Sequence, residues 1–320
     1  YKKRIVDYMF NEYSMGRTPN PDVLCNREIK FDIFLQTALS LGADFIATGH
    51  YCIKSEEIIN GKKIFRLLKG FDNKKDQSYF LCQLDQYQLE KVIFPIGQLR
   101  KNEVREIAKA EGLVTAEKKD SQGLCFIGKV KLPEFLQQKL ISKSGDVIQI
   151  PAKFENYDNY RFISSKSDLN KDLANPYEYK SSDGEKIGNH NGAYFYTIGQ
   201  RKGLAIGGTK QPLFVIKTDI NRNIVYVGEG KNHPGLYRKA LRVLKSEIHW
   251  IREDKKLMDG QSVNYMTRIR YRQPLTSAKL VQNEDFLYVF FEDQQLSITP
   301  GQFIAWYHKE ELIGSGTIFE

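Results

Sequence analysis

The sequence predicts an α/β domain with a doubly wound parallel sheet, followed by a small central domain and a C-terminal β-barrel. Two observations support this prediction. Near the N-terminus, a helical pattern, a glycine and a short apolar strand follow one another, which is the unit of a parallel sheet. From about residue 234 onward, short strands of alternating polarity are separated by turn residues, which is typical of a small barrel. We expect domains over 1–128, 129–233 and 234–320.

The elements of the α/β domain follow from the spacing of its apolar residues. Apolar side chains recur at helical intervals over 28–41, and Gly42 ends this helix. Residues 45–48 then form an apolar strand, and a second helix covers 102–111. Gly49 directly follows the strand. Because ligands bind at the carboxyl ends of strands in such sheets, Gly49 is a candidate ligand-binding position.

The central segment has a different character. A short helix is expected over 133–140. Residues 156–184 are polar and rich in Tyr, Asn, Lys and Ser, which favours an insertion or a long surface loop. The glycine-rich run 196–208 contains Arg201 and Lys202 and is expected to form a hairpin with a basic tip. It does not match the G-x-x-x-x-G-K-[ST] pattern of nucleotide-binding loops.

The C-terminal segment is predicted to form strands. Residues 263–272 alternate cleanly in polarity, and further strands are expected at 286–291, 303–307 and 312–318. The alternation puts three arginines on one face of the first strand, roughly 6.6 Å apart: Arg268, Arg270 and Arg272. Such a row could contact successive phosphates of a nucleic acid. A solvated outer face of the barrel explains the same pattern, and the spacing alone does not decide between them.

Composition narrows the class of protein. Of the 320 residues, 41% are hydrophobic and 27% are charged, which excludes a disordered or collagen-like chain. No apolar run approaches the roughly 20 residues that span a bilayer, so we expect no membrane association. The net charge of +9 favours a polyanionic partner. The three segments contribute +3, +5 and +1, so a nucleic acid would contact cations spread over a folded surface rather than a basic tail.

The cysteines indicate a reducing compartment. All four lie in the first 125 residues: Cys25, Cys52, Cys82 and Cys125. No pair has the C-x-x-C spacing of thiol redox enzymes, and their density is too low for a secreted disulfide scaffold. The five histidines are scattered, so no metal site is predicted. We therefore expect a cytoplasmic protein.

The segment 18–26, TPNPDVLCN, is the first candidate for chemistry. Two prolines stiffen it, and it places Asp22 and Cys25 just before the expected helix. The helix dipole, with Arg27 and Lys30, would stabilise a thiolate there, and Asp22 could move a proton at the same site. A proline-rich turn that is capped by Asp22 and contains a small buried cysteine fits the local sequence as well.

Two further segments are ambiguous when taken alone. Cys125 lies between Gly123 and Gly128, which suits a thiol that changes partners, but a core cysteine on a short strand is the simpler local interpretation. Cys52 and Cys82 also have the apolar neighbours of core cysteines. The segment 74–79, KKDQSY, mixes cations, amides and an aromatic, which suits contacts to RNA but also describes a solvated loop.

Taken together, these segments resemble one family, the bacterial tRNA-specific 2-thiouridylases. The resemblance covers nearly the whole chain. It depends on the order and spacing of six segments, namely 16–26, 47–51, 75–81, 120–128, 197–203 and 270–273. Each of them is a modest match alone, and their combination is highly specific.

The resemblance implies an ATP-dependent enzyme that replaces the C2 oxygen of the wobble uridine in tRNA with sulfur. The α/β domain would be the remainder of a PP-loop-type adenylation domain, using ATP with Mg²⁺ to activate that oxygen. Cys125 would carry a persulfide loaded by a sulfur-relay protein or a cysteine desulfurase, which replaces the local interpretation of this residue. Cys25 would act as nucleophile, leaving a Cys25–Cys125 disulfide, and Asp22 would be the acid/base.

The resemblance also implies binding roles. Gly49 would lie at the ATP. The target base would be contacted by Asn20, Pro21 and Asp22. The rest of the tRNA would be contacted by Lys75, Asp76, Gln77, Arg270 and Tyr271. We further expect a monomer without a bound metal cluster.

One departure from the family pattern concerns the nucleotide-binding loop. Its S-G-G-x-D-S run does not occur in these residues, and the chain opens on Tyr1 in the middle of a helical pattern. We therefore expect the loop to lie upstream. The competing hypothesis is a non-catalytic RNA-binding or sulfur-carrier protein without a working ATP site. A thiol redox enzyme is disfavoured because it would need the C-x-x-C pair.

Overall fold

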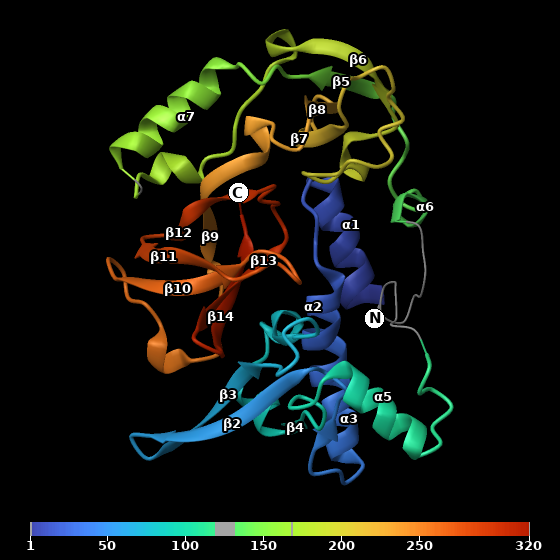
Figure 1. The fold of residues 1–320 in the computed structure, drawn as a ribbon, viewed down its shortest axis with the longest axis vertical. Coiled ribbons are helices and arrows are strands. Elements are labelled where there is room, and N and C mark those ends of the chain that lie inside the picture. The colour runs from blue at the N-terminus through green and yellow to red at the C-terminus, as the bar shows by residue number, and fades with distance from the viewer. Residues whose placement is uncertain (1, 119–131, 168, 320) are drawn as a thin grey trace.

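The computed structural model describes residues 2–118, 132–167 and 169–319. Figure 1 shows three regions. An α/β region with α3, α5 and β2–β4 lies at one end, strands β9–β14 form a barrel beside helix α1, and β5–β8 with α7 lie at the opposite end. Within the described residues, none of the helices has the length and apolar character needed to cross a bilayer.

The α/β region begins with two helical runs and, among the described residues, contains one parallel strand pair. The first run comprises a π-helical turn, Lys2–Val6, and α1, Asp7–Ser14. The second comprises α2 (Pro21–Cys25), a π-helical stretch (Asn26–Phe34) and α3 (Leu35–Ser40). Strand β1, Ile46–Ala47, pairs in parallel with β4, Val92–Ile93. The region also contains α4 (Gln86–Glu90) and α5 (Lys101–Ala110).

The helices at 28–41 and 102–111 and the strand at 45–48 are confirmed, with one correction to the first helix. It begins at Pro21 instead of residue 28, because Asn20 caps it: the Asn20 side chain accepts a hydrogen bond of 3.3 Å from the Val23 amide. Pro21 occupies the first helical position, where its missing N–H costs nothing. Cys25 therefore lies inside the helix rather than ahead of it.

The predicted barrel is confirmed. Its strands are β9 (Tyr237–Trp250), β10 (Ser262–Arg268), β11 (Thr276–Asn283), β12 (Phe286–Leu296), β13 (Phe303–His308) and β14 (Glu311–Ile318). They pair in the order β13-β10-β11-β12-β9-β14, and β13 also pairs with β14, which closes the barrel. Trp306, fully buried, packs edge-on against Trp250 inside it.

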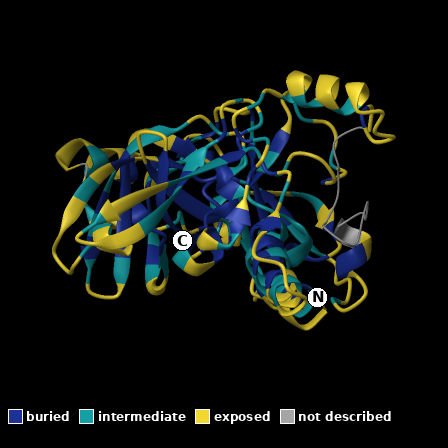
Figure 2. Ribbon diagram, turned by 90° about the horizontal axis from the view of Figure 1, so that it is seen from below, coloured by how far each residue is buried: buried dark blue, intermediate teal, exposed yellow. Residues whose placement is uncertain are grey.

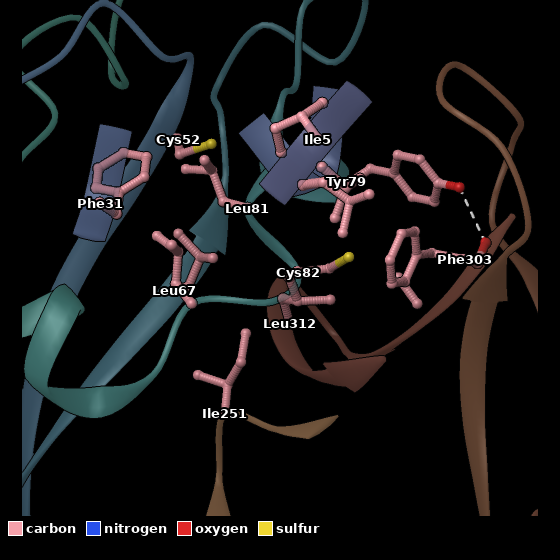
Figure 3. Close-up of a cluster of buried hydrophobic side chains, with 14 of the residues drawn as sticks. Ile5, Phe31, Cys52, Leu67, Tyr79, Leu81, Cys82, Ile251, Phe303 and Leu312 are labelled. Carbon is pink, nitrogen blue, oxygen red and sulfur yellow. Dashed lines mark hydrogen bonds between the residues drawn. The ribbon is translucent and has the colours of Figure 1, made fainter. Parts of the chain in front are cut away.

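The barrel and the α/β region share one hydrophobic core. The hairpin of β2 (Cys52–Ile59) and β3 (Lys62–Lys69) extends the barrel sheet, because β3 pairs with β14. Figure 3 shows side chains from both regions in contact across this junction, among them Leu67, Tyr79, Phe303 and Leu312. Figure 2 shows the buried residues running through the middle of the molecule. The two regions are therefore held as one body.

The central region is a four-stranded sheet with two helices. Its strands are β5 (Gly145–Gln149), β6 (Glu185–His190), β7 (Leu213–Asp219) and β8 (Ile224–Glu229), in the order β6-β5-β8-β7. The short helix expected near 133–140 is α6, Leu132–Leu136. Helix α7 spans Glu155–Lys166.

The expectation of a long surface loop over 156–184 was wrong. Tyr157 and Tyr160 of α7 are buried, and so are Leu173 and Tyr179 further along the segment. The hydroxyl of Tyr160 donates to the Leu173 carbonyl oxygen at 3.0 Å and accepts from the Lys239 amide at 2.7 Å. The tyrosines that made the segment look polar therefore form a packed aromatic cluster with satisfied hydroxyls, a role that composition alone does not reveal.

We expect Tyr160→Phe to lower the free energy of unfolding by about 1–3 kcal/mol, because it removes the donor to a buried carbonyl and an acceptor of the Lys239 amide. Urea unfolding followed by circular dichroism measures the change. Phe162→Ala is the control, since the Phe162 side chain on the same helix is 63% exposed and its loss should change little. Equal losses in both variants would contradict the packed arrangement.

Candidate functional site

The segment with the candidate nucleophile starts a helix. Asn20 is the N-cap, Pro21 and Asp22 form the first turn, and Cys25 is fully buried at the end of α2. The dipole effect of a helix falls off within its first turn. It therefore acts mainly on the half-buried Asp22 carboxylate, and the proposed stabilisation of a Cys25 thiolate by this dipole is weaker than its sequence position suggested.

The barrel holds this segment in place from one side. The Thr18 amide donates to the Pro300 carbonyl oxygen at 2.9 Å. The side-chain nitrogen of Gln302 donates to the carbonyl oxygens of Thr18 at 2.8 Å and Pro19 at 3.2 Å. Its oxygen accepts from the Asn20 side chain at 3.3 Å. The sequence does not single out Gln302, because nothing in its local sequence distinguishes it from an ordinary turn residue.

The central region holds the same segment from another side. The hydroxyl oxygens of Thr18 and Thr197 lie 3.0 Å apart. Gly16 has φ +75°, and a Cβ there would lie 2.6 Å from Cγ1 of Ile220. Only glycine accommodates both this backbone conformation and this contact. The segment before Asn20 is thus fixed where all three regions meet.

The turn at 75–77 has a buried carboxylate at its centre. Asp76 is 3% exposed and accepts from the amides of Gly70 at 3.2 Å and Ser78 at 3.1 Å. Its other oxygen lies 3.0 Å from the Arg268 guanidinium. The side-chain oxygen of Gln77 accepts from the Tyr51 amide at 3.0 Å. Asp76 therefore shapes the turn, and its carboxylate faces the protein interior.

This turn leads into residues that connect the Cys25 helix with the barrel. The Asn26 side chain donates to the Phe80 carbonyl oxygen at 3.1 Å, and the Phe80 and Tyr271 rings lie 4.3 Å apart. The Tyr79 hydroxyl donates to the Phe303 carbonyl oxygen at 2.9 Å (Figure 3). Burial raises the pKa of Tyr79, which keeps this hydroxyl protonated as a donor. Three predicted RNA-binding or catalytic segments are thereby linked.

The predicted row of arginines does not exist. Strand β10 ends at Arg268, so Arg270 and Arg272 lie in the following turn. Arg268 is buried, with its guanidinium 5.0 Å from the centre of the Tyr307 ring. Arg270 donates to the carbonyl oxygens of Leu296 and Ser297, and burial lowers its pKa. Of the three residues, only Arg272 is exposed.

Gly49 lies at the carboxyl end of β1, as expected. Among the described residues, a Cβ added there would meet only Cδ1 of Ile96 within 4 Å, at 4.0 Å, so these residues leave this face of the backbone open to a ligand. The neighbouring His50 is buried and its Nδ1 lies 2.9 Å from the Thr48 hydroxyl. Burial lowers the His50 pKa to about 3, so the ring is neutral at physiological pH.

Of the three remaining cysteines, the structure describes Cys52 and Cys82. Cys52 and Cys82 are fully buried, as predicted for core cysteines. Burial raises the pKa of Cys82 to about 12, so it stays a thiol. Cys125 lies outside the described residues. Within the described ranges, no cluster of His, Cys, Asp and Glu is arranged to hold a metal ion.

Fold and site together define a multidomain protein in which an α/β domain presents a cysteine and an aspartate on one helix, where two β domains meet it. Residues 1–129 match the family model described as tRNA methyl transferase HUP domain. Residues 176–229 match the tRNA methyl transferase PRC-barrel domain. Residues 240–318 match the aminomethyltransferase beta-barrel domain.

Close relatives agree with these matches. The proteins named tRNA-specific 2-thiouridylase MnmA from Christiangramia forsetii and Flavobacterium johnsoniae are each 58% identical over 320 residues, which is 99% of this chain and 81% of theirs. The protein of the same name from Bacillus subtilis is 42% identical over 319 residues, covering 99% and 75%. The chain belongs to the tRNA-specific 2-thiouridylase (MnmA) family, which confirms the resemblance seen in the sequence.

Proposed function

We propose that this chain is a tRNA-uridine 2-sulfurtransferase, which replaces the C2 oxygen of the wobble uridine with sulfur in an ATP-dependent reaction. One structural observation supports this proposal in addition to family membership. Three segments far apart in the sequence meet around the Cys25 helix: the start of that helix, the turn ending at Phe80, and the turn containing Arg270 and Tyr271. Such a meeting point can hold a nucleotide of a folded RNA beside a thiol.

In this proposal, residues 20–25 at the start of the helix carry out the chemistry. Asn20, Pro21 and Asp22 contact the target base, and Asp22 transfers protons at its polar edge. The Cys25 thiolate attacks the Cys125 sulfur of a persulfide, forming a Cys25–Cys125 disulfide and releasing hydrosulfide. The hydrosulfide adds at C2 of the uridine, and the activated oxygen leaves. Two equivalents of an external thiol then reduce the disulfide and are themselves oxidised to a disulfide, which restores both cysteines.

ATP, when bound, supplies the adenylate that makes the C2 oxygen a leaving group, and we expect Mg²⁺ to accompany it. Gly49 fits a place beside the nucleotide because a side chain there would occupy the open face at the end of β1. His50, the residue after Gly49, is neutral and adds no charge to this face.

The partners follow from the same scheme. The substrate is tRNA, contacted by Lys75, Gln77, Arg270 and Tyr271, while we assign buried Asp76 the task of positioning its neighbours. A sulfur-relay protein or a cysteine desulfurase loads Cys125. We propose a cytoplasmic monomer with domains over 1–128, 129–233 and 234–320. A non-catalytic RNA-binding or sulfur-carrier protein is not favoured, because the relatives named above are thiouridylases.

The direct test is the formation of 2-thiouridine. The full-length protein is incubated with unmodified tRNA, ATP and a persulfide donor, and the tRNA nucleosides are analysed by mass spectrometry. The proposal expects 2-thiouridine only when ATP is present. A protein that binds tRNA but forms no 2-thiouridine under these conditions would be the non-catalytic alternative.

Arg270→Gln is expected to weaken tRNA binding and to reduce the slope of log K against log salt by about 1, since one phosphate contact is lost. Fluorescence anisotropy with labelled tRNA at several salt concentrations measures the slope. Lys256→Gln is the control, because Lys256 is exposed and lies in the turn before β10, away from the Cys25 helix. An unchanged slope for Arg270→Gln would show that Arg270 only supports the 297–302 turn.

A further inference from the structure

The glycine-rich segment 196–213, which we call the basic loop, has no part in the chemistry proposed above. The expected hairpin is absent: between Tyr196 and β7 the backbone forms no strand. The segment contains Arg201, Lys202 and Lys210 and no carboxylate. A loop with this composition on a chain that binds a polyanion is a candidate contact surface.

The first part of the basic loop is fixed in place. The Gly199 amide donates to the Val215 carbonyl oxygen at 2.7 Å, and the Val215 amide donates to that of Gln200 at 3.0 Å. Gly199 has φ +84°, and a Cβ there would lie 2.5 Å from the Ser297 hydroxyl oxygen. The loop therefore leaves from a point wedged between β7 and the 297–302 turn of the barrel.

Residues 200–204 of the basic loop are anchored at both ends. The Gln200 side chain accepts from the Thr197 amide at 3.0 Å and donates to the Lys202 carbonyl oxygen at 2.8 Å. Leu204, two residues further on, is buried in the core of the central sheet. Arg201 and Lys202 lie between these anchors with exposed side chains, and neither forms an ion pair with any carboxylate that the structure describes.

The basic loop starts next to the proposed base-binding segment. Thr197 touches Thr18, two residues before Asn20. Arg201 is four residues beyond Thr197, so their Cα atoms are at most about 14 Å apart. Arg270, which donates to the Ser297 carbonyl oxygen, lies at the same barrel turn that Gly199 contacts. The basic loop and Arg270 therefore both contact the barrel turn 297–302, which also holds the Thr18–Asn20 segment.

We propose that Arg201 and Lys202 bind the sugar-phosphate backbone of the tRNA beside the nucleotide whose base lies at Asn20–Asp22. This inference rests on the proposed function. A guanidinium and an ammonium group that pair with no carboxylate in the described part of the chain are suited to phosphate oxygens, and their fixed backbone lowers the entropic cost of binding. The backbone contact orients the RNA and leaves base selection to the helix start.

The test compares two paired variants. Arg201→Gln/Lys202→Gln removes both cations of the basic loop. Lys62→Gln/Lys63→Gln removes an adjacent exposed pair at the tip of the β2–β3 hairpin, which lies at the opposite end of the molecule from β7 (Figure 1). Binding of unmodified tRNA is measured by fluorescence anisotropy between about 50 and 200 mM salt. Both sites are exposed, so neither variant should disturb folding.

The loop variant should reduce the slope of log K against log salt by about 1.5 to 2, and the hairpin variant should leave it unchanged. The rate of 2-thiouridine formation at saturating tRNA should stay at the wild-type value while KM for tRNA rises. An unchanged slope in the loop variant, or equal reductions in both variants, overturns this inference alone. If the wild-type protein does not bind tRNA, the proposed function itself fails.

Discussion

Cys25→Ser is expected to abolish 2-thiouridine formation in the full-length protein. Serine keeps nearly the same volume in this fully buried position, but its hydroxyl cannot form the disulfide that releases sulfur from the persulfide. The helix would still begin at Asn20 and Pro21, so the tRNA should bind as before. Mass spectrometry of the tRNA nucleosides measures the product, and anisotropy measures binding in the same preparation.

Cys52→Ser is the matched control, because Cys52 is also fully buried and receives the same substitution. Both variants bury a hydroxyl and share the stability cost of about 1–3 kcal/mol that this brings. Of these two variants, only Cys25→Ser should lose activity. Cys125→Ser should lose it as well, since it removes the carrier of the persulfide. Normal thiolation by either the Cys25 or the Cys125 variant would refute the sulfur-transfer scheme.

Asp76→Asn should lower the free energy of unfolding by about 3–5 kcal/mol, because it leaves a buried charge without its counter-charge. The side chains of Arg268 and Asp76 are only 8% and 2% exposed, so water cannot replace the lost carboxylate. An asparagine oxygen can still accept from the Gly70 and Ser78 amides, so the turn keeps its backbone contacts. Urea unfolding gives the loss directly.

Two controls separate the charge from the position. Asp76→Asn combined with Arg268→Met should regain most of the lost stability, since no uncompensated buried charge remains. Asp158→Asn should change it by at most about 0.5 kcal/mol, because the side chains of the Arg161–Asp158 pair are 58% and 73% exposed. A small effect of Asp76→Asn would show that the pair is not important for the fold. A large loss without recovery in the double variant would show that the loss does not come from the unpaired charge of Arg268.

Local sequence patterns determined several of the regular elements. The barrel strands at 286–291, 303–307 and 312–318 follow from short apolar runs with turn residues between them, and α5 follows from its helical pattern and Gly112. These elements are predictable because their pattern and their ends lie within about ten residues. The family, and with it the candidate cysteines, also followed from the order of short motifs.

Tertiary structure alone decided how the site is assembled. The alternation through Arg268 and Arg270 predicted one strand, but the strand ends at Arg268, which is buried against Asp76 almost two hundred residues away. The tyrosines of α7 looked like surface residues in the sequence, but Tyr157 and Tyr160 both pack against the ring of Tyr177. Gln302 reaches the Thr18–Asn20 segment only because the closed barrel places its turn there. These contacts join residues far apart in the chain, so no local pattern records them.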